Sequence, residues 1–291
     1  MLVDTVLEGD GVRLEAWEAG DPAGPPMLLL HGVSRRRQTF TPLLPWLVPR
    51  FRLCAYDHRG HGGSGRHTQY RVVDYAADCR RVLPPSGSVV LYGHSLGALV
   101  ALATAAAAPE RVAGIVLEDP PGPSFLAAVA RGLYAAVFEL YREHASSELA
   151  VRDLARVLAA APLPAAPGMP ATTFGATRDP AAVRFTASCL KCLDPATMTP
   201  LLAGEWLAGL DWGRVLAGVT CPTLLLRADQ ARGGMLPDDD AAAIRDTIRD
   251  VTTIDLAGVG HNAVGQQPDI VPRLVLPFLE TLSFGGPTAG A

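Results

Sequence analysis

Short apolar runs of the kind found in buried strands alternate along the chain with longer segments of helical periodicity. This alternation is typical of a mostly parallel sheet covered by helices, because parallel strands are joined by helical crossovers. The expected strands are residues 12–18, 27–30, 53–56, 89–92, 115–117, 223–227 and 251–256. The expected helices are residues 41–48, 72–83, 95–108, 238–249 and 268–282. The sequence therefore predicts an α/β fold in which a mostly parallel sheet is flanked by helices.

One long stretch interrupts this alternation. Residues 122–215 have no clear strand pattern and consist of helical segments with proline-rich joints and scattered aromatic residues. We interpret the stretch as a helical cap, or lid, inserted between two core strands; the alternative is that its helices cover a face of the sheet. We therefore expect an α/β core of residues 1–121 and 216–283, a cap of residues 122–215 and a flexible tail of residues 284–291.

The segment Gly93-His94-Ser95-Leu96-Gly97 has the pattern G-x-S-x-G and lies between two expected elements. A buried strand ends at Tyr92 and an alanine-rich helix begins near Leu96. On such a turn the serine adopts a strained backbone, and the flanking glycines relieve crowding where strand and helix nearly touch. We therefore predict that Ser95 is an exposed nucleophile. An inactive elbow is the alternative.

A serine nucleophile needs a base. After this kind of elbow the residues follow in the order serine, acid, histidine along the chain, so the base is expected last. Of the seven histidines, His261 has the expected place, in a loop after the strand at 251–256 and before the last helix. His94 is expected to face away from Ser95 and to serve in packing. The histidines in or near a turn-rich loop are expected to be structural, namely His58, His61 and His67.

Two further motifs resemble those of the α/β-hydrolase superfamily. His31-Gly32-Val33 resembles the HG oxyanion turn of that family, and residues 57–64 resemble its D-x-R-G-x-G-x-S loop. With the elbow and the G-x-G-H loop, the similarity spans residues 27–282 and points to an esterase- or lactonase-like branch with a helical lid. The resemblance implies that the N–H groups of Val33 and Leu96 form the oxyanion hole. It also implies that His31 and Asp57 hold loops.

The acid of the predicted triad has three candidates. Many members of the family place it after the strand that corresponds to 223–227 in a G-x-x-D pattern, but Ala231 occupies that position here. Asp229 lies two residues earlier, where a shifted loop could still use it. Other branches use an acid directly after the preceding core strand, where this chain has Glu118 and Asp119. We favour Asp119 and keep Asp229 and Glu118 as alternatives.

These residues favour a serine hydrolase that cleaves a carboxylic ester or lactone of a small, moderately hydrophobic substrate through an acyl-enzyme. Arg35, which follows the oxyanion turn, is a candidate for binding a substrate carboxylate, with a solvated loop as the alternative. A lyase or cyclase of specialised metabolism that uses the triad as a base is a second hypothesis. A ligand-binding, receptor-like protein is a third.

The composition limits the binding partners and the cellular location that we expect for this protein. The formal net charge of −4 is spread along the chain and lacks the basic stripe of a nucleic-acid-binding protein. Five cysteines form no disulfide framework, and the single C-x-x-C at Cys189 and Cys192 has no second pair to complete a zinc site. No signal peptide is visible, and the longest apolar run, residues 98–108, is too short for a membrane helix. We expect a cytoplasmic protein without metal, cofactor or membrane partner. The sequence carries no signal for an oligomeric state.

Overall fold

The computed structural model describes residues 2–129, 132–164 and 171–284. Its centre is an eight-stranded sheet of order β1-β2-β4-β3-β5-β6-β9-β10, in which β2 alone runs against its neighbours. The strands are β1 (Val3–Glu8), β2 (Arg13–Ala19), β3 (Pro26–Leu30), β4 (Arg52–Tyr56), β5 (Val89–His94), β6 (Val112–Glu118), β9 (Thr223–Ala228) and β10 (Val251–Leu256). The mostly parallel sheet is as predicted. Of the expected flexible tail, residues 285–291 lie outside the described part of the chain.

The sequence pattern missed one strand of this sheet. Strand β1 lies at the edge, pairs only with β2, and alternates between exposed and half-buried side chains. It also includes the charged residues Asp4 and Glu8, so that neither a continuous apolar run nor a strongly apolar face marks it in the sequence. An edge strand needs no buried second face, which explains why a search for buried runs overlooks it.

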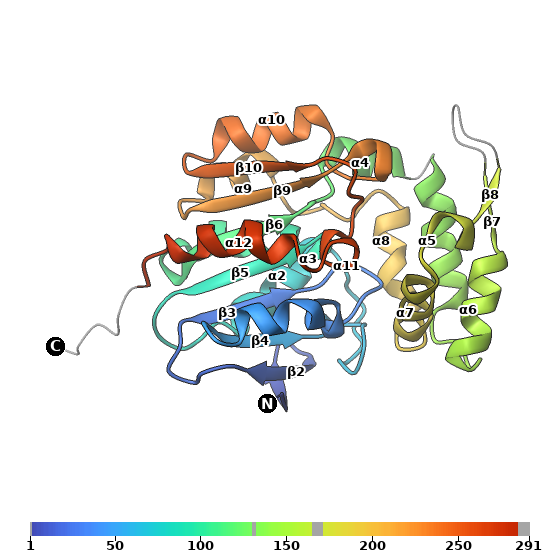
Figure 1. Ribbon diagram of the computed structural model, residues 1–291, viewed down its shortest axis with the longest axis horizontal. Coiled ribbons are helices and arrows are strands. Elements are labelled where there is room, and N and C mark those ends of the chain that lie inside the picture. The colour runs from blue at the N-terminus through green and yellow to red at the C-terminus, as the bar shows by residue number, and fades with distance from the viewer. Residues whose placement is uncertain (1, 130–131, 165–170, 285–291) are drawn as a thin grey trace.

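Helices cover both faces of the sheet (Figure 1). One face packs against α2 (Val72–Arg81), α3 (Leu96–Ala107), α9 (Trp212–Gly218) and α10 (Asp238–Thr247). The other packs against α1 (Leu44–Leu47), α11 (Ala263–Gln266) and α12 (Val271–Glu280). All six residues of β5 are buried, with Val89 and Leu91 in one apolar cluster and Val90 and Tyr92 in the other. The strand that carries the G-x-S-x-G segment is therefore central in both the sheet and the core.

The helix expected at 41–48 is divided in two. A 3-10 helix, η1 (Arg37–Leu43), is followed directly by the single turn of α1. Pro42 and Pro45 interrupt this stretch, and proline lacks the N–H that a continuous helix needs. The other short 3-10 helices are η2 (Pro109–Arg111), η3 (Gly175–Thr177), η4 (Pro195–Met198) and η5 (Gln230–Arg232).

A helical insertion connects β6 with β9 and lies beside the sheet in Figure 1. Its elements are α4 (Pro123–Val129), α5 (Leu133–His144), α6 (Val151–Ala160), α7 (Pro180–Leu190), α8 (Thr199–Leu202) and the two-residue strands β7 (Pro162–Leu163) and β8 (Thr172–Thr173). Helix α9 crosses the expected boundary at 215/216 and packs against α3, where a Cβ on Gly218 would lie 3.0 Å from Ala106. Helix α9 therefore covers the sheet and is not grouped with α5–α8. The sequence does not separate the two, because both segments have helical periodicity.

No single helix in the described residues is both long and apolar enough to cross a membrane. Helices α4 and α5 reach that length and composition only as a pair with a bend of 68°. The apolar run that stands out in the sequence corresponds to α3, which is buried between the sheet and other helices.

Candidate active site

Ser95 lies on a sharp turn between β5 and α3. Its φ of 54° and ψ of −116° place an L-residue in a strained backbone conformation, which is stored mostly at functional sites. The flanking glycines permit the turn, because a Cβ on Gly97 would overlap the carbonyl oxygen of Leu30 and one on Gly93 would overlap that of Gly97. The Ser95 N–H donates to the Glu118 carbonyl of the neighbouring strand, at 2.9 Å. The residue is 4% exposed, so the elbow is covered in this structure and the expected exposure of Ser95 is not observed.

The turn after β3 comes directly against Ser95. A Cβ on Gly32 would lie 3.1 Å from the Ser95 Cβ, and the Arg35 N–H closes the turn onto the Gly32 carbonyl at 3.2 Å. Within this turn the Val33 N–H has no hydrogen-bond partner among the described residues. Leu96 is the first residue of α3, where the helix itself supplies no partner for an N–H group. Both expected oxyanion donors therefore border the serine.

Asp119 and His261 are joined by a hydrogen bond of 2.6 Å between Oδ2 and Nδ1. The Asp119 carboxylate also accepts the N–H groups of Ala228, at 3.2 Å, and Met235, at 2.8 Å. These contacts fix the carboxylate, whose residue has a positive φ of 45° and is 1% exposed. Since a carboxylate accepts, His261 carries its proton on Nδ1 and leaves Nε2 free to act as a base.

The other two candidate acids bind different groups. Asp229 accepts the N–H groups of Ala231 and Gly258, both at 2.9 Å, and these bonds lower its pKa. Glu118 accepts from the Tyr92 hydroxyl at 2.9 Å and from the Val264 N–H at 3.0 Å. Neither carboxylate is bonded to His261, so of the three candidates the structure brings only Asp119 to the histidine.

His94 packs against His261, with ring centroids 4.8 Å apart. Its Nε2 donates to the His261 carbonyl at 3.0 Å, and a Cβ on Gly32 would lie 2.8 Å from its Nδ1. Burial lowers the pKa of His94, and the nearby His261 and Arg35 side chains lower it further, so the His94 ring is neutral. The side chain serves in packing as expected, but it packs on the loop of the expected base. Among the described residues no hydrogen bond joins Ser95 Oγ to His261, a contact that often forms only when substrate binds.

A cluster of three buried histidines supports the turn beside Ser95. The His31 ring centroid lies 4.5 Å from that of His58 and 5.3 Å from that of His61. His31 Nε2 accepts from the His58 N–H at 3.0 Å, and His61 Nε2 accepts from the Ser34 N–H at 3.2 Å. Burial lowers the pKa of His31 and of His61 to about 3. These rings are therefore neutral and hold loops. Asp57 also holds a loop, because its carboxylate accepts the N–H groups of Arg37 and Gly63.

The pattern of the alpha/beta hydrolase fold family matches residues 25–268. The chain belongs to this family. The chain resembles solved structures over nearly its whole length. At sequence identities below 25%, this resemblance shows a shared fold and nothing about the reaction. One is E-2-(acetamidomethylene)succinate hydrolase, with a TM-score of 0.74, 24% identity, and coverage of 97% of this chain and 100% of the other. Another is the enol-lactonase of Burkholderia xenovorans LB400, with a TM-score of 0.71, 18% identity, and coverage of 95% and 100%.

Curated relatives of this α/β hydrolase match over shorter segments. The 2-(acetamidomethylene)succinate hydrolase of Mesorhizobium japonicum is 39% identical over 111 residues, which are 37% of this chain and 39% of that protein. The pimeloyl-[acyl-carrier protein] methyl ester esterase of Methylococcus capsulatus is 35% identical over 94 residues, 32% of this chain and 36% of that protein. The match therefore spans about two fifths or less of these relatives' lengths.

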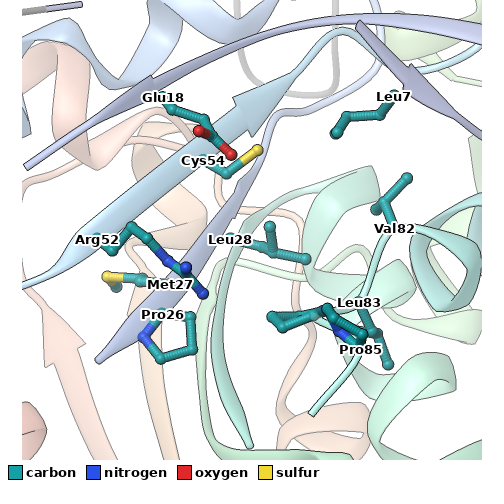
Figure 2. Close-up of a pocket in the computed structure, with 11 residues that line it drawn as sticks. Leu7, Glu18, Pro26, Met27, Leu28, Arg52, Cys54, Val82, Leu83 and Pro85 are labelled. Carbon is teal, nitrogen blue, oxygen red and sulfur yellow. The ribbon is translucent and has the colours of Figure 1, made fainter. Parts of the chain in front are cut away.

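A cavity of about 240 Å³ lies at the amino ends of β3 and β4, where Pro26, Met27 and Arg52 contribute to its lining (Figure 2). Pro26 and Arg52 begin β3 and β4, whereas Ser95, Asp119 and the loop of His261 follow the carboxyl ends of their strands. In parallel sheets of this kind, ligands bind outside the carboxyl ends of the strands. The cavity is therefore not part of the candidate active site. Within the described ranges, no group of three or more metal-binding side chains comes together.

Sequence reasoning missed the residues that support the loop of His261. Tyr92, Val264 and Met235 contribute a hydroxyl and two backbone N–H groups that hold the two carboxylates at the end of β6. Backbone N–H donors have no signature in the sequence. The sequence pattern identifies Tyr92 only as the last apolar residue of a strand. In the sequence, the adjacent acids Glu118 and Asp119 are the one feature that indicates that the end of β6 holds the loop of His261.

Replacing Glu118 with alanine is expected to lower kcat by about 10-fold to 100-fold, because it leaves the Tyr92 hydroxyl and the Val264 N–H buried without a partner. Burial raises the pKa of Glu118 to about 7, so the carboxyl is partly protonated near neutral pH. Glu118→Gln is expected to keep kcat near wild type, since its amide can serve both partners. The measurement is kcat as a function of pH for both variants. Glu110→Ala, at an exposed carboxylate, is the control; equal losses in E118A and E118Q would contradict the proposed role.

Proposed function

We propose that this protein is a serine hydrolase that cleaves a carboxylic ester or lactone through an acyl-enzyme. The observation that carries the proposal is the bond of 2.6 Å between Asp119 and His261 next to a serine on a strained elbow. An imidazole held with its proton on Nδ1 presents Nε2 as a general base. The names of an esterase and of an enol-lactonase among its relatives agree with this chemistry.

In this mechanism Ser95 Oγ attacks the substrate carbonyl while His261 Nε2 takes its proton. The N–H groups of Val33 and Leu96 stabilise the charge that develops on the carbonyl oxygen. His261 then protonates the leaving alcohol, which departs and leaves an acyl group on Ser95. Water, deprotonated by His261, cleaves the acyl-enzyme and restores the serine.

Asp119 keeps the imidazole in the required tautomer and stabilises its charged form. Its oxygens are already bonded to two backbone N–H groups, so little reorganisation is needed when His261 becomes charged. Helices α5–α8 act as a cap that excludes water and contributes apolar contacts to a small substrate. Ser95 is almost fully covered in this structure, so the groups around the elbow have to move before a substrate can enter.

Pre-steady-state hydrolysis of a 4-nitrophenyl ester tests the proposal. We expect a burst of nitrophenol whose amplitude approaches the enzyme concentration, together with an acyl adduct in the mass of the rapidly quenched protein. Ser95→Ala should abolish both signals. A lyase that uses the triad only as a base predicts no adduct on its own substrate, and product release that is linear from time zero without any adduct would contradict an acyl-enzyme.

A further inference from the structure

Three consecutive arginines follow the turn beside Ser95, and their partners differ. Arg37 pairs with the carboxylates of Asp57 and Asp4. Within the described part of the chain, no carboxylate oxygen lies within 4.0 Å of the Arg35 or Arg36 guanidinium. Their partners are neutral hydroxyl groups of helix α7. Arg35 Nη1 donates to Thr186 Oγ1 at 2.7 Å, and Arg36 Nη2 donates to Ser188 Oγ at 3.2 Å.

Both of these side chains are partly buried between the turn and α7. The guanidinium carbons lie 6.0 and 5.8 Å from the centre of the Phe185 ring for Arg35 and Arg36, respectively. The Nε of Arg36 is buried without a hydrogen-bond partner. Removing a charged group from water costs free energy unless an opposite charge or a full set of hydrogen bonds compensates. Two adjacent guanidinium groups with only neutral partners therefore have unused capacity to bind an anion.

The position of this pair relates it to the candidate nucleophile. The Arg35 N–H closes the turn in which Gly32 approaches Ser95, so the Arg35 side chain starts one short turn away from the serine. The Arg35 charge also acts, after burial and His261, to lower the pKa of His94, which packs against His261. A ligand anion held at Arg35 would consequently lie within electrostatic reach of the site.

We propose that Arg35 and Arg36 bind a carboxylate of the substrate, so that the ester cleaved by this enzyme carries an acid group. This inference rests on the function proposed above. A guanidinium presents parallel N–H donors that match a carboxylate, and charge-assisted hydrogen bonds are roughly twice as strong as neutral ones. The substrate carboxylate replaces the hydroxyl groups of Thr186 and Ser188 as the partner of the arginines. Binding thereby exchanges a neutral contact between core and insertion for an ionic one.

The test uses 4-nitrophenyl half-esters of dicarboxylic acids of five to seven carbons, each paired with its methyl-capped neutral ester. The quantity measured is the ratio of kcat/KM for the acid to kcat/KM for the neutral partner. We expect Arg35→Ala and Arg36→Ala each to lower this ratio by about 10-fold or more, because a hydrogen bond to a charged group is lost. Arg35→Lys should restore part of it, since it keeps the charge without the fork. Arg249→Ala removes an equal charge from an exposed position and should leave the ratio unchanged.

An unchanged ratio in both alanine variants would overturn the proposal, as would an equal loss of activity on acidic and neutral esters. A second measurement separates this result from a failure of the proposed function. Calorimetric titration of the half-ester into Ser95→Ala needs no hydrolysis, and we expect its affinity to fall about 10-fold or more when Arg35→Ala is added. If S95A binds the half-ester no better than the neutral ester, there is no carboxylate site, whatever the chemistry at Ser95.

Discussion

Replacing Asp119 with asparagine is expected to lower kcat by about three to four orders of magnitude while the protein stays folded. An asparagine has one acceptor oxygen in place of the two carboxylate oxygens that now serve His261 and two backbone N–H groups. Its amide cannot stabilise a charged imidazole, and its N–H₂ group favours the wrong tautomer of His261. The loss should appear in kcat more than in KM, because the interaction strengthens in the transition state.

Asp229→Asn is the matched control for that variant. Asp229 is half-buried and, among the described residues, accepts only backbone N–H groups of its own loop and of the neighbouring loop. We expect its replacement to change kcat by no more than a few-fold. A variant D119N with kcat near wild type, combined with a large loss in D229N, would show that the acid lies after β9 and that the observed pair is structural. Circular dichroism and thermal melting should confirm that both variants are folded.

The second large effect is expected on stability, at the ion pair between Arg59 and Asp78. Both side chains are almost completely buried, with Nε to Oδ2 at 2.6 Å and Nη2 to Oδ1 at 2.7 Å. Asp78 also accepts the N–H of Asp10, so the pair joins the loop after β4, helix α2 and the loop between β1 and β2. Asp78→Ala leaves a buried guanidinium without its counterion, and we expect the free energy of unfolding to fall by about 3–5 kcal/mol.

Urea unfolding measures this change, and an exposed ion pair provides the control. Arg152 and Asp153 form a pair whose side chains are largely accessible, so Arg152→Ala should cost less than about 1 kcal/mol. Replacing both buried partners, in Arg59→Met with Asp78→Leu, should cost less than Asp78→Ala alone because no charge remains without a partner. A loss below about 1 kcal/mol in D78A would mean that water or another group compensates the arginine.

The sequence predicted the sheet well because buried central strands have continuous apolar runs. The runs ending at Tyr92 and Tyr56 extend by only a few residues in the structure. The strand at 251–256 also has the expected limits, although it is an edge strand; its β-branched residues mark it in the sequence. Edge strand β1 escaped because its alternating, partly exposed side chains resemble those of a loop. The limits of the insertion were less predictable, since α9 and the helices α5–α8 have the same periodicity, whereas in the structure α9 packs on α3 of the core.

The candidate site was predictable in its motifs and not in its contacts. The elbow and the loop of His261 have local patterns, but the acid depends on a hydrogen bond between residues 142 positions apart. Glu118, Asp119 and Asp229 are all carboxylates at the ends of β6 and β9, so the type of residue alone does not identify the acid of the triad. Only the register of these two parallel strands and the course of the following loops separate them. The contacts of Arg35 and Arg36 with α7 likewise depend on how the insertion folds back on the core.

The most direct test of Ser95 as the nucleophile is the site at which a fluorophosphonate probe labels the folded protein. We predict one adduct per chain, located by peptide mapping on Ser95, and no adduct in Ser95→Ala under the same conditions. Asp119→Asn should be labelled far more slowly, because the same base activates the serine toward the probe. A folded wild-type protein that is not labelled, or a Ser95→Ala variant that is labelled as fully as the wild type, would contradict the mechanism.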